Sequence, residues 1–222
     1  MARGRAPQYD DQRALILSQA ARLFAQQGFM ATSMNQVAEA CGLSKAALYH
    51  YFRDKYALVA HIAETHVRQL LEVVMQAQAE CTEPTALLGL LIQRFVREYA
   101  SAQDAHRVLT EDVRFLAEED RQRILGVERE VVSRFAQAMR ALRPELGGRE
   151  LDKPLAMLLF GMINWLFTWF KPGRGLGYEQ LAPMVADLFL HGMLDMGLPG
   201  QAPGAPPRRR ASRSHDTTRT PT

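Results

Sequence analysis

Apolar residues recur along most of this chain at intervals of three and four positions, which is the spacing of one face of an α-helix. This pattern predicts an all-α protein. The predicted helices cover residues 10–27, 34–41, 45–51, 55–79, 84–99, 105–116, 120–142, 151–170 and 178–196.

The helix predicted for residues 151–170 is apolar on nearly every side. A helix of this kind in a protein without a membrane span has to be buried on two sides. We expect one side to face the protein's own core and the other to face a second subunit. Asn164 and Thr168 lie four positions apart on one face of it, where their polar atoms require partners.

The segment from Ser33 to Leu58 predicts two short helices joined by a tight turn and followed at once by a third helix. Ser33 is a candidate N-cap, and Gln36 stands three positions later, as in a capping box. Gly42 supplies the left-handed residue of the turn, and Ser44 caps the next helix. Helix, glycine turn and helix at this spacing indicate a helix-turn-helix, whose second helix enters the major groove of DNA.

The second of these helices carries residue types suited to a DNA contact. Ala46 is small enough for close approach, while Lys45, Tyr49 and His50 can bond to phosphates or base edges. The alternative is an ordinary pair of helices with surface aromatics, but four consecutive ring residues from Tyr49 argue against it. We therefore favour DNA binding, because the cap, turn and helix signals agree.

Residues Ala20 to Leu58 resemble the N-terminal DNA-binding domain of the TetR family of transcriptional regulators. The resemblance implies a homodimer in which the last two long helices form a four-helix bundle across a two-fold axis, and a body that binds a small molecule. The matching positions are Ala21, Leu23, Phe24, Gly28, Phe29, Thr32, Ser33, Val37, Ala38, Gly42, Leu43, Ser44, Leu48, Tyr49, Tyr51, Phe52, Lys55 and Leu58.

These observations predict an N-terminal three-helix helix-turn-helix domain and a C-terminal helical domain for ligand binding and dimerisation. The predicted parts are a basic disordered arm at residues 1–9, the DNA-binding domain at 10–56, the helical domain at 57–198 and a disordered Arg/Pro/Gly-rich tail at 199–222. Whether Arg3, Arg5 and the arginines of the tail touch DNA or are merely solvated stays open. The predicted DNA-contacting residues are Ser33, Ser44, Lys45, Ala46, Tyr49, His50 and Lys55.

Charge is distributed unevenly along the chain. Residues 1–60 hold seven Lys or Arg against four acidic residues, and residues 199–222 hold five Arg against one Asp. The middle of the chain is therefore mildly acidic, although the net charge of the whole is +3. Because the N-terminal domain is basic, we expect it to bind a polyanion such as DNA, which agrees with the helix-turn-helix assignment.

Several classes of function are disfavoured by the sequence. It contains no phosphate-binding glycine loop, no nucleophile elbow and no His/Cys cluster with metal-ligand spacing, so we predict no catalytic site, no metal and no cofactor. No apolar run is long enough for a membrane span, and the N-terminus lacks the apolar core of a signal peptide. With Cys41 and Cys81 read as reduced thiols, we expect a cytoplasmic protein.

A ligand pocket in the helical domain would be lined by apolar and aromatic side chains with a few polar groups. For each such residue, the plain core or the dimer interface is the alternative role. Residues Gly161 to Gly173 resemble a segment of TetR regulators of fatty-acid, sterol-ring or aromatic-acid degradation, several of which respond to acyl-CoA; Arg94, Arg97 or Arg114 would then meet the CoA phosphates. The predicted lining residues are Phe95, Tyr99, Phe115, Asn164, Trp165, Thr168 and Trp169.

The function predicted from the sequence is a ligand-responsive repressor that binds a palindromic operator as a dimer and is released by a small apolar or acyl-CoA-like effector. An architectural DNA-binding protein without a ligand, an activator of the same family and an enzyme with a DNA-binding head are the alternatives. The sequence gives no operator, no regulated gene and no effector identity.

Overall fold

The computed structural model describes residues 7–173 and 175–198, and the predicted arm and tail lie almost wholly outside this range. Within it the chain forms helices and no β-strand, so the predicted all-α class is confirmed. The α-helices are α1 (Pro7–Gln27), α2 (Met34–Ala40), α3 (Lys45–Tyr51), α4 (Lys55–Glu80), α5 (Pro84–Ser101), α6 (Gln103–Arg107), α7 (Glu118–Leu142), α8 (Asp152–Asn164), α9 (Leu166–Trp169) and α10 (Tyr178–Asp195), with η1 (Val108–Asp112) a π-helix and η2 (Val113–Phe115) and η3 (Pro144–Arg149) 3-10 turns.

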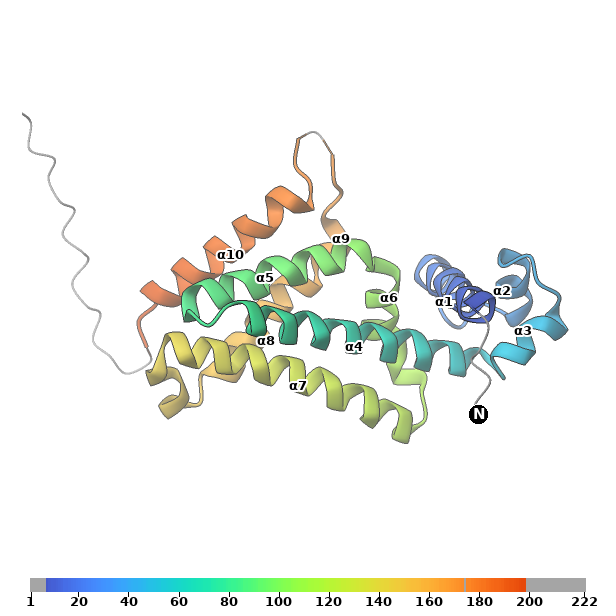
Figure 1. The fold of residues 1–222 in the computed structure, drawn as a ribbon, viewed down its shortest axis with the longest axis horizontal. Coiled ribbons are helices and arrows are strands. Elements are labelled where there is room, and N and C mark those ends of the chain that lie inside the picture. The colour runs from blue at the N-terminus through green and yellow to red at the C-terminus, as the bar shows by residue number, and fades with distance from the viewer. Residues whose placement is uncertain (1–6, 174, 199–222) are drawn as a thin grey trace, which may run out of the picture.

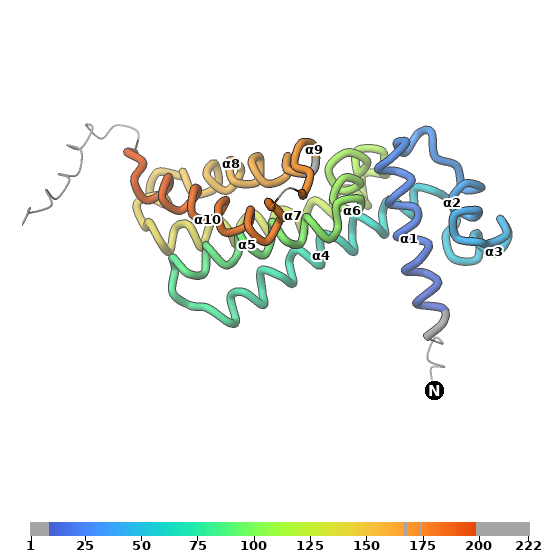
Figure 2. The backbone as a smooth tube through the Cα atoms, turned by 90° about the horizontal axis from the view of Figure 1, so that it is seen from above, coloured from blue at the N-terminus to red at the C-terminus, as the bar shows by residue number. Residues whose placement is uncertain are grey.

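The molecule is elongated, with a small three-helix unit at one end (Figure 1). We call α1–α3 the head and α5–α10 the body. The long helix α4 begins in the head and runs into the body, where it packs against α5 and α7. Helix α10 packs on α5 and helix α8 packs on α7, which places α8 and α10 on the same side of the body (Figure 2).

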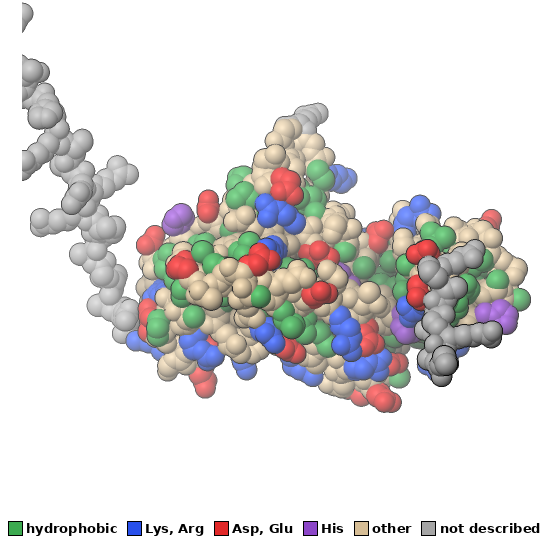
Figure 3. Space-filling model, viewed as in Figure 1, with side chains coloured by type: hydrophobic (Ala, Val, Ile, Leu, Met, Phe, Trp, Pro, Cys, Tyr) green, Lys and Arg blue, Asp and Glu red, His purple; other side chains and the backbone are tan. Residues whose placement is uncertain are grey.

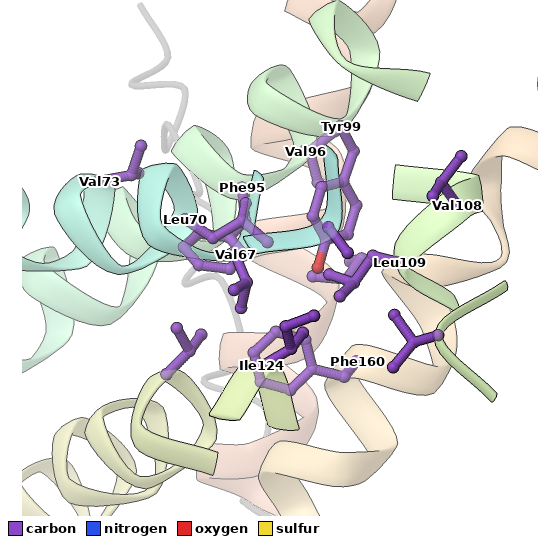
Figure 4. Packing of buried hydrophobic residues seen from close by; sticks show 14 of the residues in the cluster. Val67, Leu70, Val73, Phe95, Val96, Tyr99, Val108, Leu109, Ile124 and Phe160 are labelled. Carbon is purple, nitrogen blue, oxygen red and sulfur yellow. The ribbon is translucent and has the colours of Figure 1, made fainter. Parts of the chain in front are cut away.

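The centre of the body is an aromatic cluster between α5, α7 and α8. The rings of Phe95 and Phe135 lie 4.8 Å apart, and the ring of Phe160 lies 5.0 Å from that of Phe135, all in edge-on arrangements. Val67 and Leu70 of α4 pack toward this cluster (Figure 4). Because Phe95 and Phe135 are fully buried, the apolar faces that their helices show in sequence are core faces.

Two predicted helices are interrupted in the structure. Residues 105–116 form α6, η1 and η2 instead of one helix, because the Thr110 hydroxyl donates to the carbonyls of His106 and Arg107 at 3.1 Å and competes with the backbone ladder. Residues 151–170 form α8 and α9, because the amide and the hydroxyl of Thr168 both bond to the carbonyl of Trp165, a tighter turn than that of an α-helix.

The start of the first helix was also placed too late. Helix α1 begins at Pro7, not at Asp10 or Asp11, since proline fits the first helical turn without losing a backbone hydrogen bond. The other predicted helices have the expected positions to within a few residues. The domain boundary predicted after residue 56 falls in the first turn of α4, which both domains share.

Candidate DNA-binding and effector sites

The helix-turn-helix is built by local hydrogen bonds. The Ser33 hydroxyl accepts from the amide of Gln36 at 3.3 Å, and the Gln36 side chain accepts from the amide of Ser33 at 2.8 Å, which completes the predicted capping box. Gly42 has φ of 66°, a conformation that favours glycine. Its amide donates to the carbonyl of Glu39 at 3.0 Å, so that α2 ends in a tight turn.

Helix α3 presents one face to the head and one to solvent. Its cap forms as the Ser44 hydroxyl accepts from the amide of Ala47 at 3.1 Å. Leu48 is fully buried against the head and Phe52 nearly so. The opposite side of α3 is open at the end of the molecule, and its exposed side chains are the predicted DNA-contacting residues Lys45, Ala46, Tyr49 and His50.

Both serines predicted to contact DNA use their hydroxyls as helix caps, and the Lys55 side chain is bonded to the head. The Lys55 ammonium donates to the carbonyls of Phe29 at 3.0 Å, Thr32 at 3.3 Å and Met30 at 3.4 Å. It also lies 4.3 Å from the centre of the Phe29 ring. Lys55 therefore ties the loop between α1 and α2 to the start of α4, a role that the sequence motif did not show.

Replacing Lys55 with methionine is expected to lower the free energy of unfolding by about 1–3 kcal/mol, because the hydrogen bonds and the ring contact are lost while the side-chain stem remains. Urea unfolding monitored by circular dichroism measures this, with the exposed Lys153→Met as the control. Equal stability of the wild type and Lys55→Met would show that the ammonium does not hold the loop.

The body contains an enclosed cavity of about 50 Å³ between α4, α5, α6, η1, α7 and α8. Two of the seven residues predicted to bind a ligand, Tyr99 and Asn164, line it. The side-chain oxygen Oδ1 of Asn164 is buried and has no hydrogen-bond partner among the described residues. The other residues of the lining are Val67, Leu70, His106, Leu109, Glu128, Val131, Val132, Met157 and Phe160.

The remaining predicted ligand residues lie elsewhere. Phe95 belongs to the aromatic cluster and does not line this cavity itself; its ring packs behind two lining residues, Tyr99 and Phe160, with ring centres 5.9 Å away in each case. Phe115 stacks on Phe29 of the head at 5.1 Å. Trp165, Thr168 and Trp169 are exposed on the outer side of α8 and α9. These seven side chains therefore do not share one wall in the single chain, since Asn164 lines the cavity while both tryptophans are exposed.

Two buried histidines in this region were not among the predicted site residues. His66 Nε2 on α4 lies 3.2 Å from His106 Nδ1 on α6, and the His106 ring stacks on Tyr99 at 3.8 Å. Burial lowers the pKa of His66 to about 4, and burial together with its neighbour His66 lowers the pKa of His106 to about 3. Both rings are therefore neutral at physiological pH.

Glu128 was also missed, and burial raises the pKa of its carboxyl. The sequence did contain a signal for it, because Glu128 follows Ile124 by four positions and precedes Val131 by three on the inward stripe of α7. Arg94 and Arg97, considered for a CoA phosphate, are each ion-paired, with Glu80 and Glu179 respectively.

Charged side chains elsewhere are mixed over the surface. On the face shown in Figure 3, acidic and basic groups are interspersed along the body. Among the described residues, no helix is both long and apolar enough to cross a lipid bilayer.

Comparison with known proteins matches both parts of the chain. The sequence profile described as "Bacterial regulatory proteins, tetR family" matches residues 16–62. A second profile, "Tetracyclin repressor-like, C-terminal domain", matches residues 81–193. The first match spans the head from the middle of α1 onward and the start of α4, and the second spans nearly the whole body.

Individual relatives extend this likeness over most of the chain. A TetR-family regulator from Bordetella parapertussis 12822 has 35% identity and a TM-score of 0.79, covering 86% of this chain and 100% of that one. The repressor KstR2 from Mycolicibacterium smegmatis is 27% identical over 189 residues, which is 80% of this chain and 88% of KstR2. AibR in complex with isovaleryl coenzyme A and operator DNA has 25% identity and a TM-score of 0.68, covering 82% of this chain and 97% of AibR.

The chain spans about half the length of several other curated relatives that it matches, all of them transcriptional regulators. None of these matched proteins is an enzyme, in agreement with the prediction from the sequence. The motif residues, the helical architecture and the two profile matches lead to one conclusion: this chain belongs to the TetR family of DNA-binding transcriptional regulators.

Proposed function

We propose that this regulator is a repressor that binds a palindromic operator as a homodimer and releases it when a short acyl-CoA or similar effector binds in the body. The observation that carries the proposal is the exposed face of α3, where Lys45, Tyr49 and His50 point away from a capped and buried framework. Such a face at the end of a molecule is suited to the major groove. Action on DNA is also the reason to expect this protein in the cytoplasm.

The proposed dimer is supported by an uncovered apolar face on α8, α9 and α10. A groove of about 650 Å³ lies between these helices, with Trp169, Met184 and Leu188 in its lining. Trp165 is 65% exposed and Leu188 is 67% exposed. Monomers rarely expose large contiguous apolar patches, so a second copy related by a two-fold axis is the occupant we propose. The two copies of α3 would then meet major grooves about 34–36 Å apart.

The effector proposal is supported by the enclosed cavity and by the likeness to AibR, whose structure contains isovaleryl coenzyme A. A cavity of about 50 Å³ admits only a short acyl group without rearrangement. The unpartnered Asn164 oxygen in its wall would accept a hydrogen bond from a ligand. A CoA phosphate that reached Arg94 or Arg97 would have to displace Glu80 or Glu179.

The proposed release follows from the packing of the head on the body. Helix α1 packs against α6, and α4 joins the head to the wall of the cavity. An effector that enlarges the cavity would shift α4 and α6 and change the separation of the two α3 helices. Such a ligand lowers operator affinity by its preference for the shifted state, about tenfold for each 1.4 kcal/mol.

Titration of the promoter region of its own gene tests the DNA-binding part. The double variant Lys45→Ala/Tyr49→Ala should bind at least about 100-fold more weakly than the wild type, since a dimer loses four contacts of this kind. The matched control Lys153→Ala/His191→Ala changes two exposed residues of the body and should bind within about twofold. If the Lys45→Ala/Tyr49→Ala variant binds the operator as tightly as the wild type, α3 does not contact the DNA.

The same titration, repeated with competitor DNA and with ligands, tests the sequence specificity and the effector response. If binding is sequence-specific, an excess of random DNA at fixed salt should leave the operator complex intact. An architectural protein would instead dissociate from the operator and bind the random DNA. Isovaleryl-CoA and other short acyl-CoAs should release the operator, and free CoA should not. A promoter fusion that falls in expression when the protein is present supports a repressor, and a rise would instead make it an activator.

A further inference from the structure

A second and larger cavity lies at the junction between the head and the body. It has a volume of about 250 Å³ and is lined from α1, α4, α5 and α6. Helix α1 lies across the end of the body beside α6 in both views (Figures 1 and 2). A molecule bound here would therefore contact the head and the body at the same time.

The junction cavity is open to solvent and adjoins a second open hollow of about 460 Å³. The two share Ser18 and Ala21 of α1 together with Ala102 and Ala105 at the α5–α6 corner. These small side chains leave the space between the helices open. At about 250 Å³ the cavity is slightly smaller than the usual range of ligand sites, which begins at about 300 Å³, so its ligand is small.

The surface that lines the cavity is mostly apolar, although five of the ten lining residues have polar side chains and one of these is acidic. Leu17 and Ile62 contribute apolar surface, and no lysine or arginine is among the lining residues. Glu98 of α5 is partly buried, and among the described residues its carboxylate has neither an ion pair nor a hydrogen bond. Burial raises the pKa of this carboxyl. A cationic group is the partner that stabilises such a carboxylate best, because a partly buried charge interacts most favourably with an opposite charge.

The junction cavity lies beside the enclosed cavity of the body, separated from it by two histidines. His66 lines the junction cavity, and His106, whose Nδ1 lies 3.2 Å from His66 Nε2, lines the enclosed one. The histidine pair is thus part of the wall between them. A ligand in the junction cavity would contact both this wall and α1. Its binding could therefore affect the proposed effector site and the head together.

We infer that the junction cavity binds a small amphiphile made of an apolar body and a protonated amine, with the ammonium group paired to Glu98. Occupancy adds contacts between α1 and the body, and so changes the affinity for the operator. This last effect rests on the proposed function, while the binding itself does not.

Binding is tested on the full chain without DNA, using hexylamine and its uncharged match 1-hexanol as probes at neutral pH. Amide shifts in ¹H–¹⁵N spectra report the affinity and the location. Hexylamine should bind saturably and shift residues of α1 and α6, and hexanol should bind at least about tenfold more weakly. Glu98→Gln should remove this difference, while the control Glu72→Gln, an exposed acid of α4, should keep it.

A second variant tests the position of the apolar body. Ala105→Leu places extra methyl groups in the cavity and should weaken both probes, provided that its thermal unfolding shows a folded protein. If Ala105→Leu does not fold, the Glu98→Gln variant alone tests the binding site. Equal affinity for amine and alcohol, or an unchanged hexylamine affinity in Glu98→Gln, overturns the assignment.

Operator titration with and without hexylamine separates this inference from the proposed function. Operator binding without any amine effect, in a protein that does bind hexylamine through Glu98, supports the cavity and overturns its link to DNA. Amine binding by a protein that does not bind the operator overturns the proposed function and leaves the cavity assignment supported.

Discussion

Replacing Leu188 with aspartate is expected to split the proposed dimer into monomers and to lower operator affinity at least about 100-fold. Leu188 is 67% exposed in the single chain and stands in the apolar groove of α8, α9 and α10. If that groove is covered by a second copy, the substitution buries an unpaired carboxylate, and a two-fold interface contains it twice. The cost is about 3–5 kcal/mol for each buried charge without a partner, far more than a small dimer interface tolerates.

Sedimentation velocity over a range of protein concentrations measures this dissociation. Met75→Asp is the matched control, because Met75 is 51% exposed on α4, outside the groove. It should remain a dimer. A Leu188→Asp variant that stays dimeric with full operator affinity would place the dimer interface on another surface.

The Trp165→Ala substitution lies on the same uncovered side. It should likewise weaken the proposed dimer more than it weakens the effector response.

Acidification is expected to destabilise the protein through His66 and His106. The pKa of His66 is about 4 and that of His106 about 3 in the folded state, both below the ordinary value of 6.5. The unfolded chain therefore binds more protons than the folded one below pH 6.5, and stability falls as the pH falls. Between pH 6.5 and 4.5 each histidine removes up to about 2–3 kcal/mol from the free energy of unfolding.

Asp112 acts in the opposite direction over part of this range. Burial and the neighbouring Glu111 raise its pKa to about 6, so the folded protein binds this proton more readily than the unfolded chain does. Its contribution therefore grows as the pH falls from 6 toward 4. The histidine effect is larger, because it involves two groups and wider shifts.

Urea unfolding at several pH values isolates the histidine contribution. His106→Phe keeps a ring on Tyr99 but cannot titrate, so its stability should fall less steeply below pH 6.5 than that of the wild type. The control His191→Ala removes an exposed histidine and should leave the slope unchanged. Parallel slopes for the wild type and His106→Phe would show that the buried pair takes up protons without cost.

The sequence by itself determined the elements whose signals are local. A cap needs one hydroxyl or carboxylate three residues before an amide, and a left-handed turn needs a glycine, so Ser33, Gly42 and Ser44 could be placed from their neighbours alone. The exposed face of α3 followed, because Leu48 and Phe52 identify its buried side. The family resemblance rested on the same residues.

Only the tertiary structure decided which distant residues meet. The pairing of His66 with His106 joins positions 40 apart, and Lys55 reaches carbonyls 23 to 26 residues earlier. Both tryptophans lie at the surface of the single chain, while Glu128 and Asn164 line one cavity. Helical periodicity shows which face of a helix is apolar, but not which partner covers that face. The cavity proposed as the effector site depends on these partners, so only the packing of α4, α5, α6, η1, α7 and α8 defines it.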